Sequence, residues 1–340
     1  MTTKIHCGAA AKASSDGDNR RQPDVMGVTR LLEKTLVMAI LLALLFSSTL
    51  VAQQRSAKRA DRSYPPKLEG ATVAVYKTIG DVRLNMYIFS PEGHKPGDEA
   101  AAIVFFFGGG WRSGSPSQFQ EQCRYFASRG MVAMAADYRV ASRHGVKATA
   151  CVADAKSAIR WIRAHAKRLG IDPNRLAAGG GSAGGHLAAA TATLPDLDDP
   201  NDDLTISAIP NALVLFNPAT ILAPVGDMLP FGEGRTAEIG ERMGTEPLDI
   251  SPYHHIRKGT PPTIIFHGTA DTTVPFETVQ LFADKMTEMG NACTLVPAEG
   301  QGHGFFNFGR GDNSQYRATV RAADRFLAGL GFLEGEPTIE

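Results

Sequence analysis

The sequence has 340 residues, of which 43% are hydrophobic and 21% are charged, a composition typical of a globular protein with a sizeable apolar core. Lysine plus arginine and aspartate plus glutamate are equal at 35 each, so the formal net charge is zero. Without an excess of one sign, the chain has no overall field that would gather nucleic acid or an anionic membrane surface.

The N-terminal region has the pattern of an export signal. Arg30 and Lys34 precede an apolar run of 11 residues from Leu36 to Phe46, and small residues follow that run. A basic region, a short apolar stretch and a small-residue exit are typical of a secretory signal peptide, and the run is short for a membrane span. We therefore expect residues 1–52 to be a leader and signal peptide and 53–70 a polar linker. The mature protein is expected to be secreted or periplasmic and not inserted in a membrane, with an uncleaved anchor as the alternative.

The chain from residue 71 to 332 alternates between two kinds of apolar pattern. Period-two alternation over 73–88, broken by Gly80-Asp81, predicts a β-hairpin. Short apolar runs then alternate with amphipathic segments. The predicted strands are 103–107, 132–137, 176–178, 212–216, 263–267 and 293–296, and the predicted helices are 116–129, 148–169, 183–193, 275–289 and 313–330. This order predicts one α/β domain with a mostly parallel sheet covered on both faces. Residues 218–262 are predicted as loops, and 333–340 as a C-terminal tail.

The sharpest motif is Gly-x-Ser-x-Gly at residues 180–184, directly after a predicted strand and directly before a predicted helix. A nucleophilic serine needs this sharp turn to raise its hydroxyl above the sheet edge, and small neighbours let the backbone pass closely. The helix N-terminus behind it offers unpaired N–H groups to developing negative charge. Ser182 is therefore the candidate nucleophile.

A serine hydroxyl needs a base and an orienting carboxylate to become reactive. Asp271 follows the strand 263–267, and His303 lies in the loop before the last helix, so the order Ser182, Asp271, His303 fits a triad assembled at the carboxyl ends of parallel strands. His186 and His267 are expected to be structural, with His267 donating a hydrogen bond within its loop.

A third requirement is a set of donors for the oxyanion of the tetrahedral intermediate. Phe107-Gly108-Gly109-Gly110-Trp111 follows the first buried parallel strand, where such donors belong. We assign the N–H groups of Gly109, Gly110 and Ala183 to this role. Trp111 and Phe305 are candidates for lining the substrate pocket, with core packing as the alternative for both. The segment 218–262 lies where a lid or a pocket wall would be built.

Two charged stretches and the cysteines have plainer explanations. Arg160, Arg163, Lys167 and Arg168 fall at helical spacing and predict a solvated helix face. The acidic loop 196–203 could hold calcium, but it lacks the glycine and the terminal glutamate of an EF-hand, so a solvated loop is expected. Cys7 lies in the leader; one bridge among the other three cysteines is left open, and free thiols are expected at Cys123, Cys151 and Cys293. We expect no cofactor and no metal.

These motifs resemble the esterase branch of the α/β-hydrolases that includes hormone-sensitive-lipase-like enzymes and the acetyl and feruloyl carbohydrate esterases. The resemblance covers about residues 71–332 and rests on segments 108–111, 137–139, 180–185, 268–271 and 303–305. It implies the α/β-hydrolase fold and a Ser182–His303–Asp271 triad. Two departures, Phe107 where the family usually has histidine and Gly181 where it usually has aspartate, favour the secreted carbohydrate-esterase side.

The function expected from this resemblance is hydrolysis of short acyl esters, with acetylated or feruloylated carbohydrate as substrate and no nucleic-acid partner. The alternatives are a serine peptidase of the same fold and a non-catalytic binding module on a hydrolase scaffold. The peptidase is disfavoured because the chain has no room for the extra β domain of such enzymes. The binding module should lack an intact triad. The oligomeric state is not readable from the sequence.

Overall fold

The computed structural model describes residues 64–340, so the predicted signal peptide and most of the predicted linker lie outside the described residues. A compact unit runs from Pro66 to Glu340, whereas the sequence predicted a domain over 71–332 followed by a tail. Residues 333–340 belong to this unit and pack against the rest of it. The Arg129 guanidinium donates to the carbonyls of Glu334 and Gly335, and Arg321 donates to the carbonyl of Ile339.

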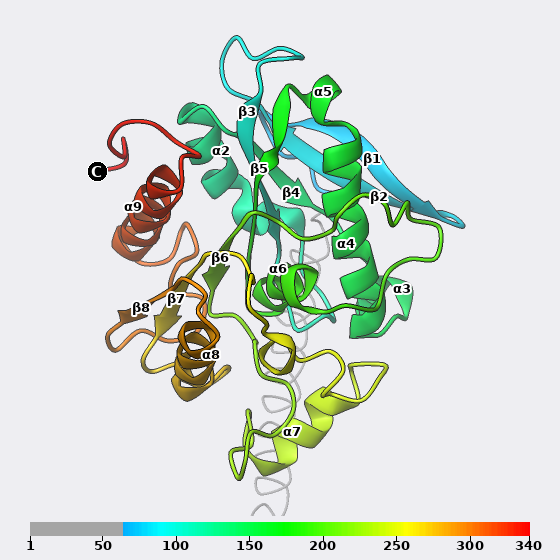
Figure 1. The fold of residues 1–340 in the computed structure, drawn as a ribbon, viewed down its shortest axis with the longest axis vertical. Helices are drawn as coiled ribbons and strands as arrows, with labels where there is room; N and C mark the ends of the chain where they lie inside the picture. Colours follow the sequence, from blue (N-terminus) through cyan, green and yellow to red (C-terminus); the bar gives the residue numbers. More distant parts are fainter. Residues whose placement is uncertain (1–63) are drawn as a thin grey trace, which may run out of the picture. The chain divides into compact units, whose positions relative to one another are not determined.

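One sheet of eight strands forms the centre, in the order β1-β2-β4-β3-β5-β6-β7-β8 (Figure 1). The predicted hairpin is present as the antiparallel pair β1–β2, and β2 also pairs antiparallel with β4; all other neighbours are parallel. The strands are β1 Thr72–Ile79, β2 Val82–Phe89, β3 Ala100–Phe106, β4 Val132–Ala136, β5 Ile171–Gly181, β6 Ala212–Phe216, β7 Thr263–Gly268 and β8 Cys293–Ala298. The mostly parallel α/β-hydrolase sheet expected from the sequence is confirmed.

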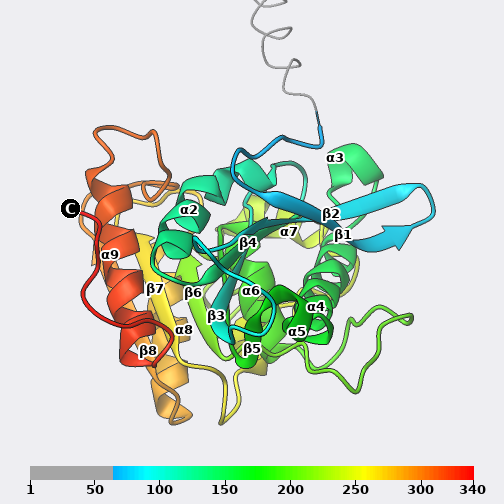
Figure 2. The same ribbon diagram turned by 90° about the horizontal axis from the view of Figure 1, so that it is seen from above.

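Helices cover both faces of this sheet (Figures 1 and 2). Alternate residues of β3 show the division: Ile103 belongs to the same buried cluster as residues of α2 (Gln120–Ser128) and α9 (Ser314–Gly329), whereas Val104 belongs to the cluster that contains residues of α4 (Ala148–Ala164), α6 (Ala183–Thr193) and α8 (Phe276–Glu288). The α6 helix is buried along its whole length, because its alanines and glycines let it lie close against β5 and β6. That close packing holds the start of α6 at the strand ends.

Four elements differ from the sequence prediction. The helix expected over 116–129 begins as a 3₁₀ turn, η1 Pro116–Phe119, and the one expected over 148–169 breaks at His165 into α4 and the short α5, Ala166–Leu169. The β5 strand begins five residues early because Ile171 already pairs with Ala100, across an irregularity in the register. The segment 218–262 is not all loop, since it contains α7 (Glu233–Gly240) and the 3₁₀ turn η2 (Pro252–His255). Glycines 232, 234 and 240 hid the α7 signal, because glycine weakens helix propensity.

The described residues also bear on the membrane and thiol expectations. Within 64–340 no helix combines the length and the apolar character needed to cross a membrane. Cys123, Cys151 and Cys293 are all free thiols, and the first two are buried. Cys7 lies outside the described residues.

Candidate active site

Ser182 sits between β5 and α6 in an unusual backbone conformation, with φ of 55° and ψ of −119°. Positive φ is rare for residues other than glycine, and such strain persists only where the surroundings impose it. Here the Ser182 N–H donates to the carbonyl of Phe216 at 2.9 Å, and its carbonyl accepts from the N–H of His186 at 3.0 Å. A Cβ on Gly180 or Gly184 would overlap the backbone. The sequence GGSAG therefore folds as the sharp strand-to-helix turn that presents a serine.

Gly181 stands where the resemblance noted from the sequence leads one to expect aspartate, and its surroundings favour glycine. A Cβ built on Gly181 would lie 2.6 Å from Cζ of Phe306. Phe306 is fully buried, stacked with Phe119 and Phe216. An aromatic ring therefore occupies the space that the aspartate side chain would need. The second departure from the family pattern, Phe107, also lies in an aromatic contact: its ring stacks on that of Tyr138, with 4.0 Å between the ring centroids.

Asp271 follows β7. The partners of its carboxylate are two backbone N–H groups, one side-chain amide and two histidine rings. Oδ1 accepts from the N–H groups of Thr273 at 2.8 Å and Val274 at 3.0 Å. Oδ2 accepts from Asn217 Nδ2 at 2.6 Å and His303 Nδ1 at 2.7 Å, and His267 Nε2 lies at 3.3 Å. Five donors therefore converge on one carboxylate whose side chain is completely buried.

Burial by itself would raise the pKa of Asp271. The hydrogen bonds from His267 and His303 and from the Val274 N–H outweigh burial and hold the pKa of Asp271 well below its usual range. The carboxylate is therefore ionised at any pH at which the protein works. An ionised carboxylate can only accept hydrogen bonds, so Nδ1 of His303 carries the proton and Nε2 is left with a lone pair.

The loops that carry Asp271 and His303 are joined through their backbones. The Ala270 N–H donates to the carbonyl of Gln301, the Thr269 N–H to the carbonyl of Ala298, and the Gly300 N–H to Oγ1 of Thr269. These bonds bring two predicted site residues, 32 positions apart, into direct contact. The hydroxyl of Ser182 donates no hydrogen bond to any residue within 64–340; in unliganded enzymes this bond is often long and tightens only with substrate.

Two residues of this network were not identified from the sequence. Asn217 directly follows β6, is completely buried, and adopts a φ of 43°. Its N–H donates to the carbonyl of Phe266, which fixes it beside the Asp271 loop. His267 was expected to donate within its loop, and it does so to the carbonyl of Val274 at 2.9 Å; its contact with Asp271 was not foreseen. Both residues lie at carboxyl ends of parallel strands, which is the signal that could have found them.

The predicted oxyanion loop passes beside Ser182. A Cβ on Gly108 would lie 3.3 Å from the Cβ of Ser182. The Gly108 N–H is already used, since it donates to Oε1 of Gln118 at 2.6 Å, whereas the N–H groups of Gly109 and Gly110 have no acceptor among residues 64–340. Both glycines have positive φ, 130° and 62°, and the first N–H of α6, on Ala183, has no partner within its helix. These three donors are the ones assigned from the sequence.

The two residues predicted to line a pocket lie in the core. Trp111 is 4% exposed and Phe305 is 3% exposed. The Trp111 indole N–H donates to Nδ1 of His186, whose Nε2 in turn lies 2.8 Å from the carbonyl of Ile250. Burial lowers the pKa of His186 to about 4, so this ring is neutral and structural, as expected. The pocket role of Trp111 and Phe305 stays a prediction.

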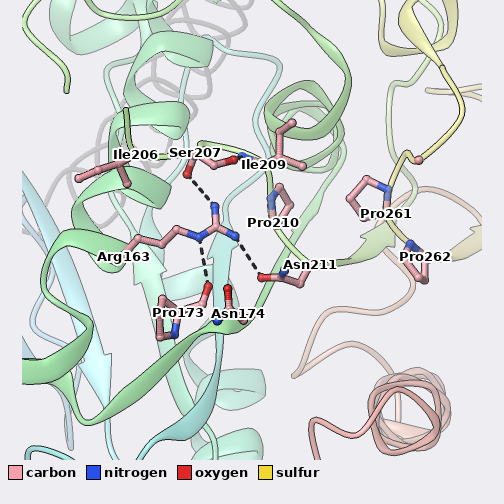
Figure 3. A pocket seen from close by; sticks show the side chains of 11 residues that line it. Arg163, Pro173, Asn174, Ile206, Ser207, Ile209, Pro210, Asn211, Pro261 and Pro262 are labelled. Carbon is pink, nitrogen blue, oxygen red and sulfur yellow. Dashed lines mark hydrogen bonds between the residues drawn. The ribbon is translucent and has the colours of Figure 1, made fainter. Parts of the chain in front are cut away.

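An open cavity of about 670 Å³ lies at the opposite edge of the sheet, near the starts of β6 and β7 (Figure 3). Arg163 reaches into it, but its guanidinium already donates to the carbonyls of Pro173 and Ser207 and to Oδ1 of Asn211. Parallel sheets bind ligands at their carboxyl ends. Arg163 is the one charged side chain that lines this cavity, and its guanidinium is already hydrogen-bonded within the protein. We therefore do not assign the cavity as the substrate site.

The basic helix face is solvated at Lys167 and Arg168, as predicted, but Arg160 pairs with the acidic loop. Arg160 binds Asp198 and Asp202, and Lys156 binds Asp198. Lys77 binds Asp199 at 2.7 Å. Among residues 64–340 no cluster of histidine, cysteine or carboxylate side chains has the arrangement of a metal site. Three of the loop carboxylates, those of Asp198, Asp199 and Asp202, are bound by basic side chains, which argues against the calcium alternative.

Comparison with known proteins agrees with this geometry. The BD-FAE family model matches residues 86–286, more than half of the 340-residue chain. Esterase LipC of Mycobacterium tuberculosis strain H37Rv is 27% identical over 231 residues, which cover 62% of this chain and 54% of LipC. The chain thus spans about half the length of the first curated relatives that it matches.

Solved structures are more similar still. Thermogutta terrifontis esterase 2 phosphonylated by sarin has a TM-score of 0.78 and 60% identity, with 81% of this chain and 100% of that chain covered. The same esterase with propionate bound has a TM-score of 0.76 and 60% identity, with 81% and 99% covered. The strand-to-helix turn at Ser182, the mostly parallel sheet and these matches together lead to one conclusion: the chain belongs to the BD-FAE family of α/β-hydrolase esterases.

Proposed function

We propose that this protein is an exported serine carboxylesterase that hydrolyses short-chain acyl esters, with acetyl or feruloyl groups on carbohydrate as its natural substrates. The observation that carries the proposal is the bond of 2.7 Å between His303 Nδ1 and the buried, ionised Asp271. That bond fixes the tautomer of His303 in which Nε2 can accept a proton. A binding module on the same scaffold would have no use for such an arrangement.

In the proposed mechanism, Oγ of Ser182 attacks the ester carbonyl carbon while Nε2 of His303 takes the hydroxyl proton. The imidazolium formed is stabilised by the Asp271 carboxylate. The tetrahedral intermediate collapses when the C–O bond to the alcohol breaks and His303 returns the proton to the leaving oxygen. Water, deprotonated by His303, then attacks the acyl carbon; the bond from that carbon to Oγ of Ser182 breaks, and His303 returns the proton to Oγ, which releases the acid and restores Ser182.

The N–H groups of Gly109, Gly110 and Ala183 are proposed to receive the oxyanion. Both glycines have positive φ, and neither N–H has an acceptor among residues 64–340, which supports the proposal that these amides are available to the oxyanion. Donors that are already aligned require no reorganisation in the transition state. Loss of one such donor typically lowers kcat about 10²–10³-fold.

The proposed short acyl range has two supports. The propionate-bound esterase from Thermogutta terrifontis, 60% identical, holds a three-carbon carboxylate, which is the acid product expected from a short acyl ester. In this chain Phe306 fills the space beside Gly181, close to the proposed nucleophile. Carbohydrate as the alcohol part of the substrate is proposed from the family resemblance and the expected export.

The decisive experiment measures hydrolysis of p-nitrophenyl acetate by the wild type, Ser182→Ala and the control Ser128→Ala, whose hydroxyl bonds a helix carbonyl in α2. We expect Ser182→Ala to lose about 10⁶-fold in kcat and the control to keep its activity. Equal rates for wild type and Ser182→Ala would eliminate the mechanism. A series of acyl chains from acetate to palmitate, then acetylated and feruloylated xylan fragments, tests the substrate class.

The proposed export is tested separately. Expression with the native leader, followed by N-terminal sequencing of the secreted product, should give a chain that begins near residue 53. An N-terminus before residue 35 would contradict cleavage of the apolar run 36–46 and would favour an anchor.

A further inference from the structure

We propose that Gln118 and Asn307 form an amide bridge that positions the oxyanion loop relative to the catalytic histidine. The two residues are 189 positions apart, yet Nε2 of Gln118 donates to Oδ1 of Asn307 at 2.9 Å. Gln118 belongs to η1 and Asn307 to the loop between β8 and α9. This inference rests on the proposed esterase mechanism and assigns two positioning residues to it.

Each end of the bridge holds one functional loop by its backbone. Oε1 of Gln118 accepts from the N–H of Gly108 at 2.6 Å, immediately before the proposed oxyanion donors at Gly109 and Gly110. Nδ2 of Asn307 donates to the carbonyl of Gly304 at 2.8 Å, immediately after His303. Three hydrogen bonds thus run from one loop to the other without a break.

The direction of these three bonds is fixed at both ends. The Gly108 N–H can only donate, so it must meet the oxygen of Gln118, and the Gly304 carbonyl can only accept, so it must meet the nitrogen of Asn307. With those two orientations set, the remaining groups are a Gln118 nitrogen and an Asn307 oxygen, which form the central bond. An amide at each position supplies a donor and an acceptor together, which neither an ionised carboxylate nor an alkyl side chain can do.

The bridge uses one amide of the oxyanion loop and leaves the next two. Gln118 accepts from the Gly108 N–H, whereas the N–H groups of Gly109 and Gly110 have no acceptor among the described residues and remain available. On the other side, Arg310 donates to the carbonyl of His303 at 2.7 Å. Two consecutive carbonyls of the histidine loop are therefore held by side chains, and only that of Gly304 is connected to the oxyanion loop.

Catalysis requires that the nucleophile, the base and the oxyanion donors fit one substrate geometry at the same time. A misplacement of about 1 Å can lower the rate about 10²-fold even when binding persists. Loss of the bridge frees the oxyanion loop to move relative to His303, which affects the tetrahedral state more than the bound ester. We therefore expect kcat to fall while KM changes little.

The test uses Gln118→Met, Asn307→Leu and the double variant, which keep volume and remove the bridge. Each single variant should lower kcat for p-nitrophenyl acetate about 10–100-fold with KM within about threefold, and the double variant should be no slower than the worse single one, because the three bonds act as a unit. Gln280→Met, the same change at an exposed position on α8, should keep wild-type kcat. Active-site titration with paraoxon expresses every rate per competent site, so misfolded material does not count.

Gln118→Glu and Asn307→Asp provide a second test if the apolar variants fold poorly. Both keep the side-chain shape, but the introduced carboxylate cannot donate, so each should lower kcat as well. The inference is overturned if these variants keep wild-type kcat, or if the effects of the single variants add in the double variant. Those outcomes differ from failure of the proposed function, in which the wild type itself lacks esterase activity or Ser182→Ala retains it.

Discussion

Two buried aspartates of this molecule differ in what neutralises them. The Asp154 side chain has no exposed surface, and two permanently charged groups bind it: Lys77 Nζ at 2.8 Å, and Arg139 through Nε and Nη2 at 2.8 Å each. The Asp271 side chain is equally buried, but its partners are two backbone N–H groups, an amide and two histidines. Among residues 64–340, no lysine or arginine side chain is paired with Asp271.

The difference separates a structural carboxylate, Asp154, from the proposed catalytic one, Asp271. The charge of Asp154 is balanced in the resting protein, so it stabilises the fold and has nothing further to attract. The charge of Asp271 is held in place by dipoles and is fully balanced only when His303 becomes an imidazolium, which happens during the proposed reaction. A buried anion without a permanent counter-ion thus favours the protonated base in the transition state.

The largest expected effect is a loss of kcat when the carboxylate of Asp271 is removed. Asp271→Asn should lower kcat about 10⁴-fold, because a neutral amide no longer fixes the tautomer of His303 or stabilises its positive charge. Steady-state hydrolysis of p-nitrophenyl acetate, with circular dichroism to verify folding, measures this. A loss below about tenfold would mean that Asp271 acts as a structural residue, like Asp154.

The matched change at Asp154 should lower the stability of the protein and leave its kcat nearly unchanged. Asp154→Asn leaves Lys77 and Arg139 without their shared anion, so the free energy of unfolding should fall by about 3 kcal/mol or more, while kcat per folded molecule stays near the wild-type value. Urea denaturation monitored by circular dichroism gives the free energy. Unchanged stability together with a large loss of kcat would remove the distinction between the two carboxylates.

A smaller effect is expected at Asn217, which makes the shortest contact with Asp271, 2.6 Å from Nδ2 to Oδ2. Hydrogen bonds to charged groups contribute about 1.5–3 kcal/mol, so Asn217→Leu should lower kcat/KM about 10–100-fold. Thr193→Val, on the buried end of α6 away from the triad, serves as a control for loss of a buried polar group. Equal activity of the two variants would show that Asn217 does not support the carboxylate.

The pH dependence follows from the lowered pKa of Asp271. Since its folded-state pKa lies below the unfolded value of about 3.9, its contribution to stability is present above that value and is lost only as pH falls through the folded pKa. Between about pH 4 and neutrality, Asp271 should therefore take up no proton. A plot of log kcat/KM against pH should have a limiting acid slope of one; a slope of two in this range would indicate that Asp271 titrates there.

The sequence predicted those parts of the site that follow from local pattern. The serine turn requires glycines beside Ser182, and chain order alone placed Asp271 and His303 at strand ends, where the structure joins them. The pairing of Arg160 with the acidic loop was missed, because helical periodicity shows which face is polar but not what lies opposite it. The alternation of apolar runs predicted a mostly parallel sheet and most strand bounds, but it did not give the order of the strands in the sheet.

Gln118, Asn307 and Asn217 could not be assigned from the sequence for a related reason. Each is a polar side chain whose partner lies far away in the chain, and nothing in its local spacing names that partner. Asn217 at least follows a buried strand at the functional edge. Gln118 lies in a 3₁₀ turn ten residues beyond Gly108, in a position that carries no signal of its own.

The chain contains only two tryptophans, Trp111 and Trp161, and their positions give the protein a built-in optical probe. Trp111 directly follows the oxyanion loop and has a φ of 59°, with its indole N–H bonded to the neutral ring of His186. Trp161 lies on α4, against His165 and Arg168. In a Trp161→Phe background, the tryptophan fluorescence comes from Trp111 alone, so its emission reports directly on the backbone next to Gly109 and Gly110 as an inhibitor binds.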